Sequence, residues 1–525
     1  MSISPKLSSR IGGLVFWLIF LFSGLAALIY QVCWQRLLGV YYGVGSVSVA
    51  IIVSIFMLGL GFGGLAGAFV SRRTKHVVFV YIVIEFLVAA FGLSSLHLLE
   101  EIGVRTAGSS YVYMLLFVSL FLIVPTVLMG ATLPIAIAIS EQRRRDLLGN
   151  VSFYYFVNTV GAAFGALLAS YVMISIFNID VAVKVAVAIN LILAAAMYYV
   201  SLSPHESASV PVEPSTQIVK GVRRGNLLSV AALLFLNGFI AIGYQIIWFR
   251  IVAILLKDSI YTFSTMLFVY LLGIAVGSLA LSYYSSRAER LPQFDLYLSL
   301  NIAIAVVSLV SLGLLYATID IPPLGWIAES THRYDVLPHL GDMGKWDGQL
   351  TLVYTLAVVV LWPLLLVLLP TIFMGAAFPV GLSLFADRAD GSGSTVGVAY
   401  ALTIAGNALG GLVTAFALLP NLGTTLVLAA FLTLQLSYVF LLGSTFAGRG
   451  LKFLSASAVV AVLIFTPDAA NFYKKLHRDY PGFGMYFNEG VEGTVVSFEK
   501  DDQLRMFING SNHGGDRGRV LCTRR

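Results

Sequence analysis

Long apolar runs separated by short polar segments make up most of this sequence. A helix needs about 20 mainly apolar residues to cross the hydrocarbon core of a bilayer. We predict a transmembrane helix in each run that is long enough: 13–33, 45–70, 77–97, 112–139, 151–175, 181–201, 227–255, 260–283, 294–316, 351–385, 396–419 and 423–443. A further run at 452–466 is short for a span, so it either crosses the membrane or lies at its surface.

The same pattern occurs twice along the chain. Five residues recur 214 positions later: Gly24, Tyr30, Gln31, Trp34 and Arg36 become Gly238, Tyr244, Gln245, Trp248 and Arg250. Residues 125–134 recur as 370–379, 245 positions later. Because six spans return the chain to its starting side, both repeats point the same way. The predicted fold is an all-α polytopic membrane protein with two parallel six-helix repeats, 13–201 and 227–443, joined by a linker at 202–226.

Composition and charge place the chain in a membrane and orient it there. Hydrophobic residues make up 58% of the chain and charged residues only 11%, against about 25% charged in soluble domains, which excludes a soluble enzyme. The bilayer is therefore the expected partner, and the net charge of +6 does not indicate nucleic-acid binding. Basic clusters at 72–75 and 143–145 share a side with residues 1–12. The positive-inside rule then predicts a multi-pass protein of the cell (inner) membrane with a cytoplasmic N-terminus.

The tail at 467–525 follows a different pattern. Two β-favouring runs flank a polar turn at 500–502, which predicts a β-hairpin, and Asn509-Gly510 is typical of a second turn. A lone hairpin is only marginally stable in water, so we expect a short β stub. The side of the membrane on which it lies depends on whether 452–466 crosses, and the sequence leaves that open.

One ionisable residue stands out within the apolar spans. Glu85 lies in the middle of the third span, and the matching position of the second repeat is the amide Asn301. A single buried carboxyl could neutralise a cationic substrate or carry a proton. The alternative is a structural glutamate that is protonated or hydrogen-bonded.

Other polar residues recur near the ends of the first helices of the repeats. Tyr30-Gln31 and Tyr244-Gln245 are candidates for lining a cavity or for bonding between helices, and Asn158 joins them on the fifth span. Trp34 and Trp248 are expected to anchor these helices at the membrane interface.

Arg36 and Arg250 lie on the side that is poor in basic residues, which suggests fixed partners. Glu100 or Glu101 is the expected one.

Prolines and glycines are placed alike in both repeats. Pro125 and Pro134 match Pro370 and Pro379, and proline removes a helical hydrogen bond, so these four are candidate helix breaks beside a cavity, or sites of simple bending. Glycines four residues apart predict close helix packing: Gly59 and Gly63, Gly161 and Gly165, Gly273 and Gly277, Gly406 and Gly410.

These motifs resemble a known architecture, the membrane-fused spermidine synthase-like (polyamine aminopropyltransferase) family with a major-facilitator-type membrane domain. Residues 24–36 and 56–64 look like its first two helices, although Gln31 stands where relatives often carry Glu. Residues 155–161 look like its fifth helix, and 489–495 with 507–510 look like the lead-in to its catalytic domain.

The resemblance implies a polyamine-related function but no catalytic site in this chain. The glycine loop that binds decarboxylated S-adenosylmethionine in full-length relatives has no counterpart here, so we expect a truncated lead-in at 467–525, no cofactor and no metal site. Three functions stay open: a transporter of a small cationic substrate such as a polyamine, an aminopropyltransferase by family, or a membrane anchor without transport.

Overall fold

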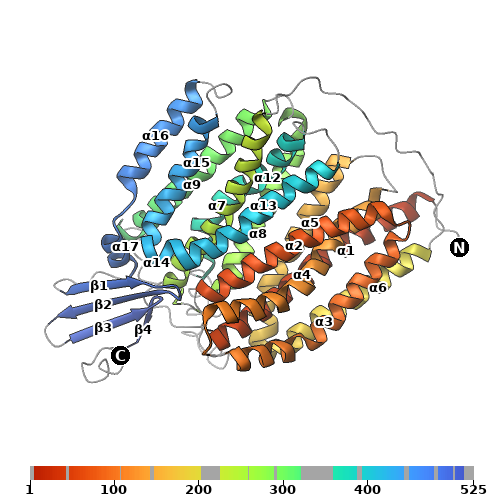
Figure 1. The fold of residues 1–525 in the computed structure, drawn as a ribbon, viewed down its shortest axis with the longest axis horizontal. Coiled ribbons are helices and arrows are strands. Elements are labelled where there is room, and N and C mark those ends of the chain that lie inside the picture. Colours follow the sequence, from red (N-terminus) through yellow and green to blue (C-terminus); the bar gives the residue numbers. More distant parts are fainter. Residues whose placement is uncertain are drawn as a thin grey trace, which may run out of the picture.

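The computed structural model of this chain shows a bundle of long helices with a small β-sheet at one end (Figure 1). It describes residues 5–42, 46–106, 108–141, 147–202, 225–257, 259, 261–288, 292–320, 359–386, 393–442, 449–477, 483–500 and 503–513. We call the membrane side where α1 begins the near side, and the side where α1 ends the far side. Residues 351–358, the start of the predicted span at 351–385, lie outside the described residues.

The first repeat contains six spans. Their bounds are α1 Pro5–Tyr42, α2 Ser46–Arg73, α3 Val77–Thr106, α4 Tyr111–Glu141, α5 Leu147–Leu168 continued by the π-helical η1 Ala169–Phe177, and α6 Ile179–Leu202. These helices cover the six runs that the hydrophobic pattern predicts.

The second repeat follows the same order after the linker. Its helices are α7 Gly225–Leu255, α8 Thr262–Ala288, α9 Gln293–Asp320, η4 Leu364–Leu368 with α12 Leu369–Ala386, α13 Gly393–Val413 with η5 Thr414–Leu418 and α14 Leu419–Leu422, and α15 Thr424–Leu442. The π-helical stretches η1 and η5 begin 245 residues apart, so the repeat extends to this uncommon feature of the backbone. Eleven of the described helices are long and apolar enough to cross a membrane, or up to twelve if the bent pair α16–α17 counts as one span.

Equivalent helices pack on each other in both repeats. α1 packs on α5 and α2 on α4, just as α7 packs on α13 and α8 on α12. Across the two repeats the contacts are reciprocal, because α5 packs on α8 while α13 packs on α2. This reciprocity is what two parallel repeats produce when they are related by an axis along the membrane normal.

The spaced glycines lie at these helix crossings, as predicted. A Cβ at Gly161 would lie 1.9 Å from the Leu21 carbonyl oxygen, and one at the equivalent Gly406 would lie 2.0 Å from that of Phe235. Backbones this close leave no room for any side chain, so the small residue is required for packing.

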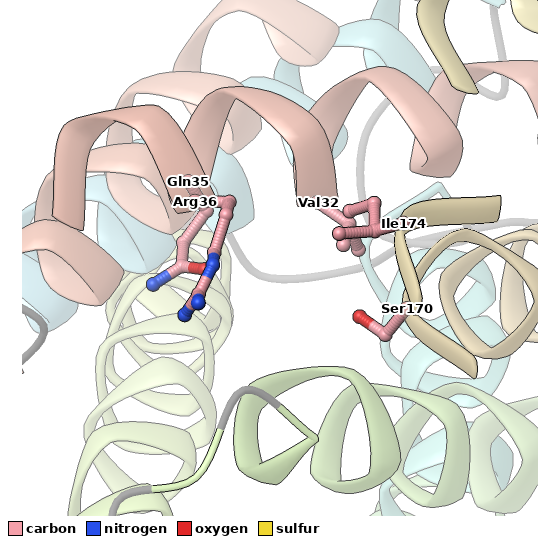
Figure 2. A pocket seen from close by; sticks show the side chains of 5 residues that line it. All are labelled: Val32, Gln35, Arg36, Ser170 and Ile174. Atoms are coloured by element: carbon pink, nitrogen blue, oxygen red, sulfur yellow. The ribbon is translucent and has the colours of Figure 1, made fainter. Parts of the chain in front are cut away.

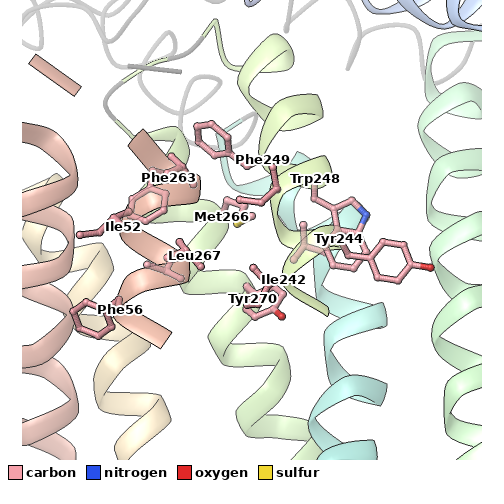
Figure 3. Packing of buried hydrophobic residues seen from close by; sticks show 14 of the residues in the cluster. Ile52, Phe56, Ile242, Tyr244, Trp248, Phe249, Phe263, Met266, Leu267 and Tyr270 are labelled. Carbon is pink, nitrogen blue, oxygen red and sulfur yellow. The ribbon is translucent and has the colours of Figure 1, made fainter. Parts of the chain in front are cut away.

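Apolar side chains fill the space between the repeats on the far side (Figure 3). Ile52 and Phe56 of α2 face a layer from α7 and α8 that includes Ile242 and Met266, and all are at most 4% exposed. Apolar packing therefore closes this part of the interface.

The prolines do not break the helices as expected. α4 is continuous through Pro125 and Pro134, and α12 is continuous through Pro379. Pro370 is the second residue of α12, two positions after η4 ends, so here the backbone departs from α-helical geometry before the proline. Neighbouring helices can accommodate a proline within a membrane helix without unwinding it, and the expectation of breaks in α4 is wrong.

The short apolar run forms α16 (Arg449–Phe465), which returns along α15 toward the far side. It packs on α15 and α9, and the Ser455 hydroxyl donates to the Leu436 carbonyl at 2.5 Å. At 1.5 Å per residue its 17 residues rise about 25 Å. After a bend of 69° the chain continues as α17 (Ala469–Leu476) and enters the sheet. The tail therefore lies on the side opposite the start of α1.

The tail is a four-stranded antiparallel sheet in the order β1-β2-β3-β4. Its strands are β1 Gly484–Glu489, β2 Thr494–Lys500, β3 Gln503–Ile508 and β4 Ser511–Asn512. The predicted hairpin is the pair β2–β3, and Asn509 and Gly510 both have positive φ in the turn to β4, as this dipeptide favours. β1 was not predicted. The sheet packs on α17 and the helix ends, which gives it the support that an isolated hairpin lacks.

Candidate functional site

Among the described polar side chains inside the bundle, three kinds of group stand out. The first occurs once in each repeat, between its first, third and sixth helices. The second lies between the repeats on η1 and the start of α8, and the third joins the sheet to the far end of α7.

Glu85 is fully enclosed in the first repeat. It is 1% exposed, and its Oε2 accepts a hydrogen bond of 2.6 Å from Nδ2 of Asn190 on α6. The Tyr81 hydroxyl also interacts with the carboxyl. Oε1 of Glu85 and Oδ1 of Asn190 have no hydrogen-bond partner among the described residues. The group is thus an incompletely bonded carboxyl–amide pair.

The second repeat holds the equivalent pair in a complete form. Asn301 matches Glu85, and Gln435 lies 245 residues after Asn190, the offset that relates the later blocks. Gln435 Nε2 donates to Asn301 Oδ1 at 3.0 Å, and Asn301 Nδ2 donates to the Tyr297 carbonyl at 2.9 Å. The Tyr244 hydroxyl donates to Gln435 Oε1 at 3.3 Å. All four amide atoms are satisfied there.

The aromatic residues near these pairs are buried and do not anchor the helices at the interface. Trp34 is fully buried and Trp248 is 3% exposed. Each stacks on the tyrosine one turn earlier, with ring centroids 5.3 Å and 5.1 Å apart, and Trp34 Nε1 donates to Ser95 Oγ at 3.1 Å. The interfacial role expected for both tryptophans is therefore wrong.

The remaining candidate residues have mainly structural positions. Asn158 donates to the Phe20 carbonyl at 3.0 Å and so ties α5 to α1. Gln31 and Gln245 are each 1% exposed, and one amide atom of each lacks a partner among the described residues. The Tyr30 hydroxyl has none either, whereas its counterpart Tyr244 reaches Gln435. None of these residues lies in the group between the repeats.

A row of hydroxyl groups joins the two repeats where η1 meets α8. Ser170 bonds to Ser264, Tyr171 bonds to Thr265 at 2.7 Å, and Ser175 bonds to Tyr261 at 3.0 Å. We call these six residues the hydroxyl zipper. Three of them lie on η1, and π-helical stretches in membrane and soluble proteins often mark functional positions. The zipper contains no charged side chain, and it lies between the two repeats.

A small hollow adjoins the zipper (Figure 2). Val32, Gln35 and Arg36 of α1 line it together with Ser170 and Ile174 of η1. Its volume of about 10 Å³ is at the lower limit for one water molecule. The polar ends of Gln35 and Arg36 extend from α1 toward the second repeat, so a guanidinium, an amide and a hydroxyl border the same space. Gln35 also donates to Ser48 of α2 at 3.5 Å.

The third group is a buried ion pair between the bundle and the sheet. Arg250 Nη1 lies 3.4 Å from Glu489 Oε2, with side chains 1% and 6% exposed. Arg250 also donates to the Gly490 carbonyl, and Glu489 accepts from the Thr424 backbone N–H at 2.8 Å. Arg250 therefore has a fixed partner, as expected, but the partner is Glu489. Glu101 instead pairs with Arg105 on its own helix.

Sequence reasoning found Glu85 but missed the residues that complete each group. Asn190 carried a usable signal, because it falls opposite Gln435 at the known offset. The hydroxyl zipper had none, since serine and threonine are common in apolar helices. Among the described residues no cluster of His, Cys, Asp and Glu could hold a metal ion.

No family model and no curated protein matches the chain. Among solved structures it is similar to the nucleoside transporter NupG, with 12% identity and a TM-score of 0.48 over 83% of this chain and 99% of that chain. It is also similar to a bacterial homologue of the human lysosomal transporter Spinster, with 14% identity and a TM-score of 0.48 over 90% and 98%. A third is the POT-family transporter PepTSo, with 13% identity and a TM-score of 0.37 over 89% and 99%. The likeness is too low to support a functional argument.

Proposed function

We propose that this chain is a small-solute transporter whose two repeats move against each other across the membrane. The observation that carries the proposal is the reciprocal interface, in which the fifth helix of each repeat packs on the second helix of the other. Two parallel repeats arranged in this way can rock about a shared axis and expose a site between them to one side at a time.

The hydroxyl zipper suits a gate on the far side. A hydroxyl–hydroxyl bond contributes only about 0.5–1.5 kcal/mol net, because water replaces it when the pair separates. The three zipper bonds, which join η1 to α8 and to Tyr261 just before it, can therefore open and close at low cost. An ion pair at the same depth would resist opening more strongly, since a separated buried charge is costly.

The residues beside the zipper suggest the kind of solute that would bind. Gln35, Arg36 and Ser170 line the hollow, and their polar side chains suit a polar group that enters when the repeats separate. The narrower proposal of a polyamine or other amine rests on the family resemblance of residues 24–36 and 155–161. No carboxylate lines this hollow, and Glu85 lies within the first repeat, so an amine would need a route that the described contacts do not supply.

The rival functions are a membrane anchor without transport and an aminopropyltransferase. A membrane anchor needs no movement between the repeats. Opening of the zipper is therefore required for a transporter but not for an anchor. The aminopropyltransferase hypothesis rests on the family resemblance alone. The polar groups found among the described residues do not include a set of side chains arranged for group transfer.

Cross-linking the zipper tests the transporter directly. Ser170 and Ser264 touch through their hydroxyls, so S170C with S264C should form a disulfide on oxidation. Proteoliposomes in a background lacking Cys33 and Cys522 would be screened with a labelled polyamine, a neutral nucleoside and an organic anion. We expect uptake of at least one solute that oxidation abolishes and a reductant restores, with each single cysteine variant unaffected. The proposal is contradicted if none of the three solutes is taken up, or if oxidation of the double cysteine variant leaves uptake unchanged.

A further inference from the structure

The Glu85–Asn190 pair of the first repeat has one hydrogen-bond donor too few, whereas the equivalent Asn301–Gln435 pair of the second repeat is complete. In the second repeat two amides satisfy each other and their neighbours. In the first repeat the amide at 301 is replaced by a carboxyl at 85, and glutamine at 435 is replaced by the shorter asparagine at 190. These changes leave two acceptor atoms without a donor, Glu85 Oε1 and Asn190 Oδ1.

Those two atoms belong to groups that are already joined by one hydrogen bond. Asn190 Nδ2 donates to Glu85 Oε2 at 2.6 Å, which brings the amide and the carboxyl side by side. A proton on Oε1 would supply the missing donor for Oδ1 and complete a two-bond acid–amide pair. In the charged form both carboxyl oxygens are acceptors. Asn190 Nδ2 and the Tyr81 hydroxyl then bond to the carboxylate, but Asn190 Oδ1 has no donor among the described residues.

No charged side chain among the described residues acts on this carboxyl. Among the described residues, the titratable groups near it are Tyr30 on α1 and Tyr81 on α3, with Cys33 beside Tyr30. Asn190 is the contact from α6. The site therefore has one ionisable carboxyl, with no basic partner that would hold it charged.

We propose that Glu85 and Asn190 form a proton-binding site in the first repeat, with one proton shared between Glu85 Oε1 and Asn190 Oδ1. Binding forms an O–H bond with a proton taken from water, and release returns that proton to water. Ionisable groups buried in membrane helices commonly serve proton relays. If the repeats transport a solute as proposed above, this site couples that transport to protons, because charging Glu85 changes how α1, α3 and α6 pack.

The direct test is infrared spectroscopy of the reconstituted full chain across a pH range. The wild type should show a protonated carboxylic-acid carbonyl band that E85Q lacks. E101Q is the matched control, since Glu101 lies on the same helix in an exposed pair and should leave the band in place. Glutamine at 85 can form the same two bonds with Asn190 that the protonated acid would form, so E85Q should fold. Identical spectra for wild type and E85Q at every pH would overturn the site.

A second readout separates the proton site from the transport proposal. In proteoliposomes, wild-type uptake of the solute found in the screen should increase with an imposed pH gradient. E85Q should keep solute exchange but lose that response. Uptake by E85Q that still follows the gradient would refute coupling, even if the band is lost. A titrating band in a protein that transports nothing would leave the site standing and refute only the transporter.

Discussion

Removing Glu489 should release the sheet from the far end of the bundle. The carboxylate pairs with Arg250 and accepts two hydrogen bonds from Thr424, and both members of the pair are almost completely buried. E489A would leave the guanidinium without its counter-charge, and breaking a buried pair from one side costs about 3–5 kcal/mol. The two carbonyls at Gly490 and Val491 still accept from Arg250, so the lower part of this range is the better estimate.

The chain can avoid this cost by undocking the sheet while the bundle stays folded. A change of about 3 kcal/mol raises the undocked population on the order of 100-fold. Hydrogen exchange of peptides covering β1, β2 and β3 measures that population directly. We expect their exchange to accelerate by about this factor, while peptides from α2 and α4 are unchanged.

Two further variants make the reasoning refutable. R105A breaks an exposed pair with side chains 79% and 49% exposed, which is worth at most about 1 kcal/mol, and it should leave the sheet protected. R250L with E489L removes both charges and should recover part of the protection, because apolar replacement of a buried pair is often close to neutral. The account is refuted if E489A exchanges like R105A, or if the double variant is as open as E489A.

Two other matched pairs of substitutions follow from the packing. G161A should lower the melting temperature of the bundle because its Cβ would lie 1.9 Å from an α1 carbonyl oxygen. G313A should be neutral or slightly stabilising because nothing lies within 4 Å of its Cβ. Equal melting temperatures for the two variants would contradict the close-packing role of Gly161. Y244F should cost about 1–3 kcal/mol because it leaves Gln435 Oε1 unpaired, whereas Y30F should cost little because its hydroxyl has no partner among the described residues. A greater loss of stability in Y30F than in Y244F would show that the hydrogen bonds are assigned to the wrong repeat.

The repeated sequence pattern predicted the helices, their order and their parallel arrangement well. Apolar runs determine spans because lipid requires every backbone group to bond within its own helix. The glycine spacing predicted close crossings such as that of Gly161 with α1 for the same kind of local reason. These features depend on neighbours along the chain, or on a repeat that can be read in the sequence.

Predictions from the sequence were wrong where the position of a side chain depends on its depth in the bundle or on a partner far away along the chain. A tryptophan near the end of an apolar helix has the same pattern whether it reaches the interface or, like Trp34, stacks inside the bundle. The partner of Arg250 is 239 residues away in the tail, so no local pattern could identify it. Pro125 and Pro134 remain within a continuous helix because neighbouring helices support it, which local rules do not describe.

Movement between the repeats is the central claim, and distances between spin labels on opposite repeats test it most directly. One pair would join exposed positions on the near side, Tyr199 of α6 and Tyr283 of α8. The other would join Val104 of α3 and Leu426 of α15 on the far side. In bilayers we predict two distance components for each pair, with conditions that shorten one pair lengthening the other. A single narrow distance for both pairs under every condition would contradict the account and indicate a static anchor.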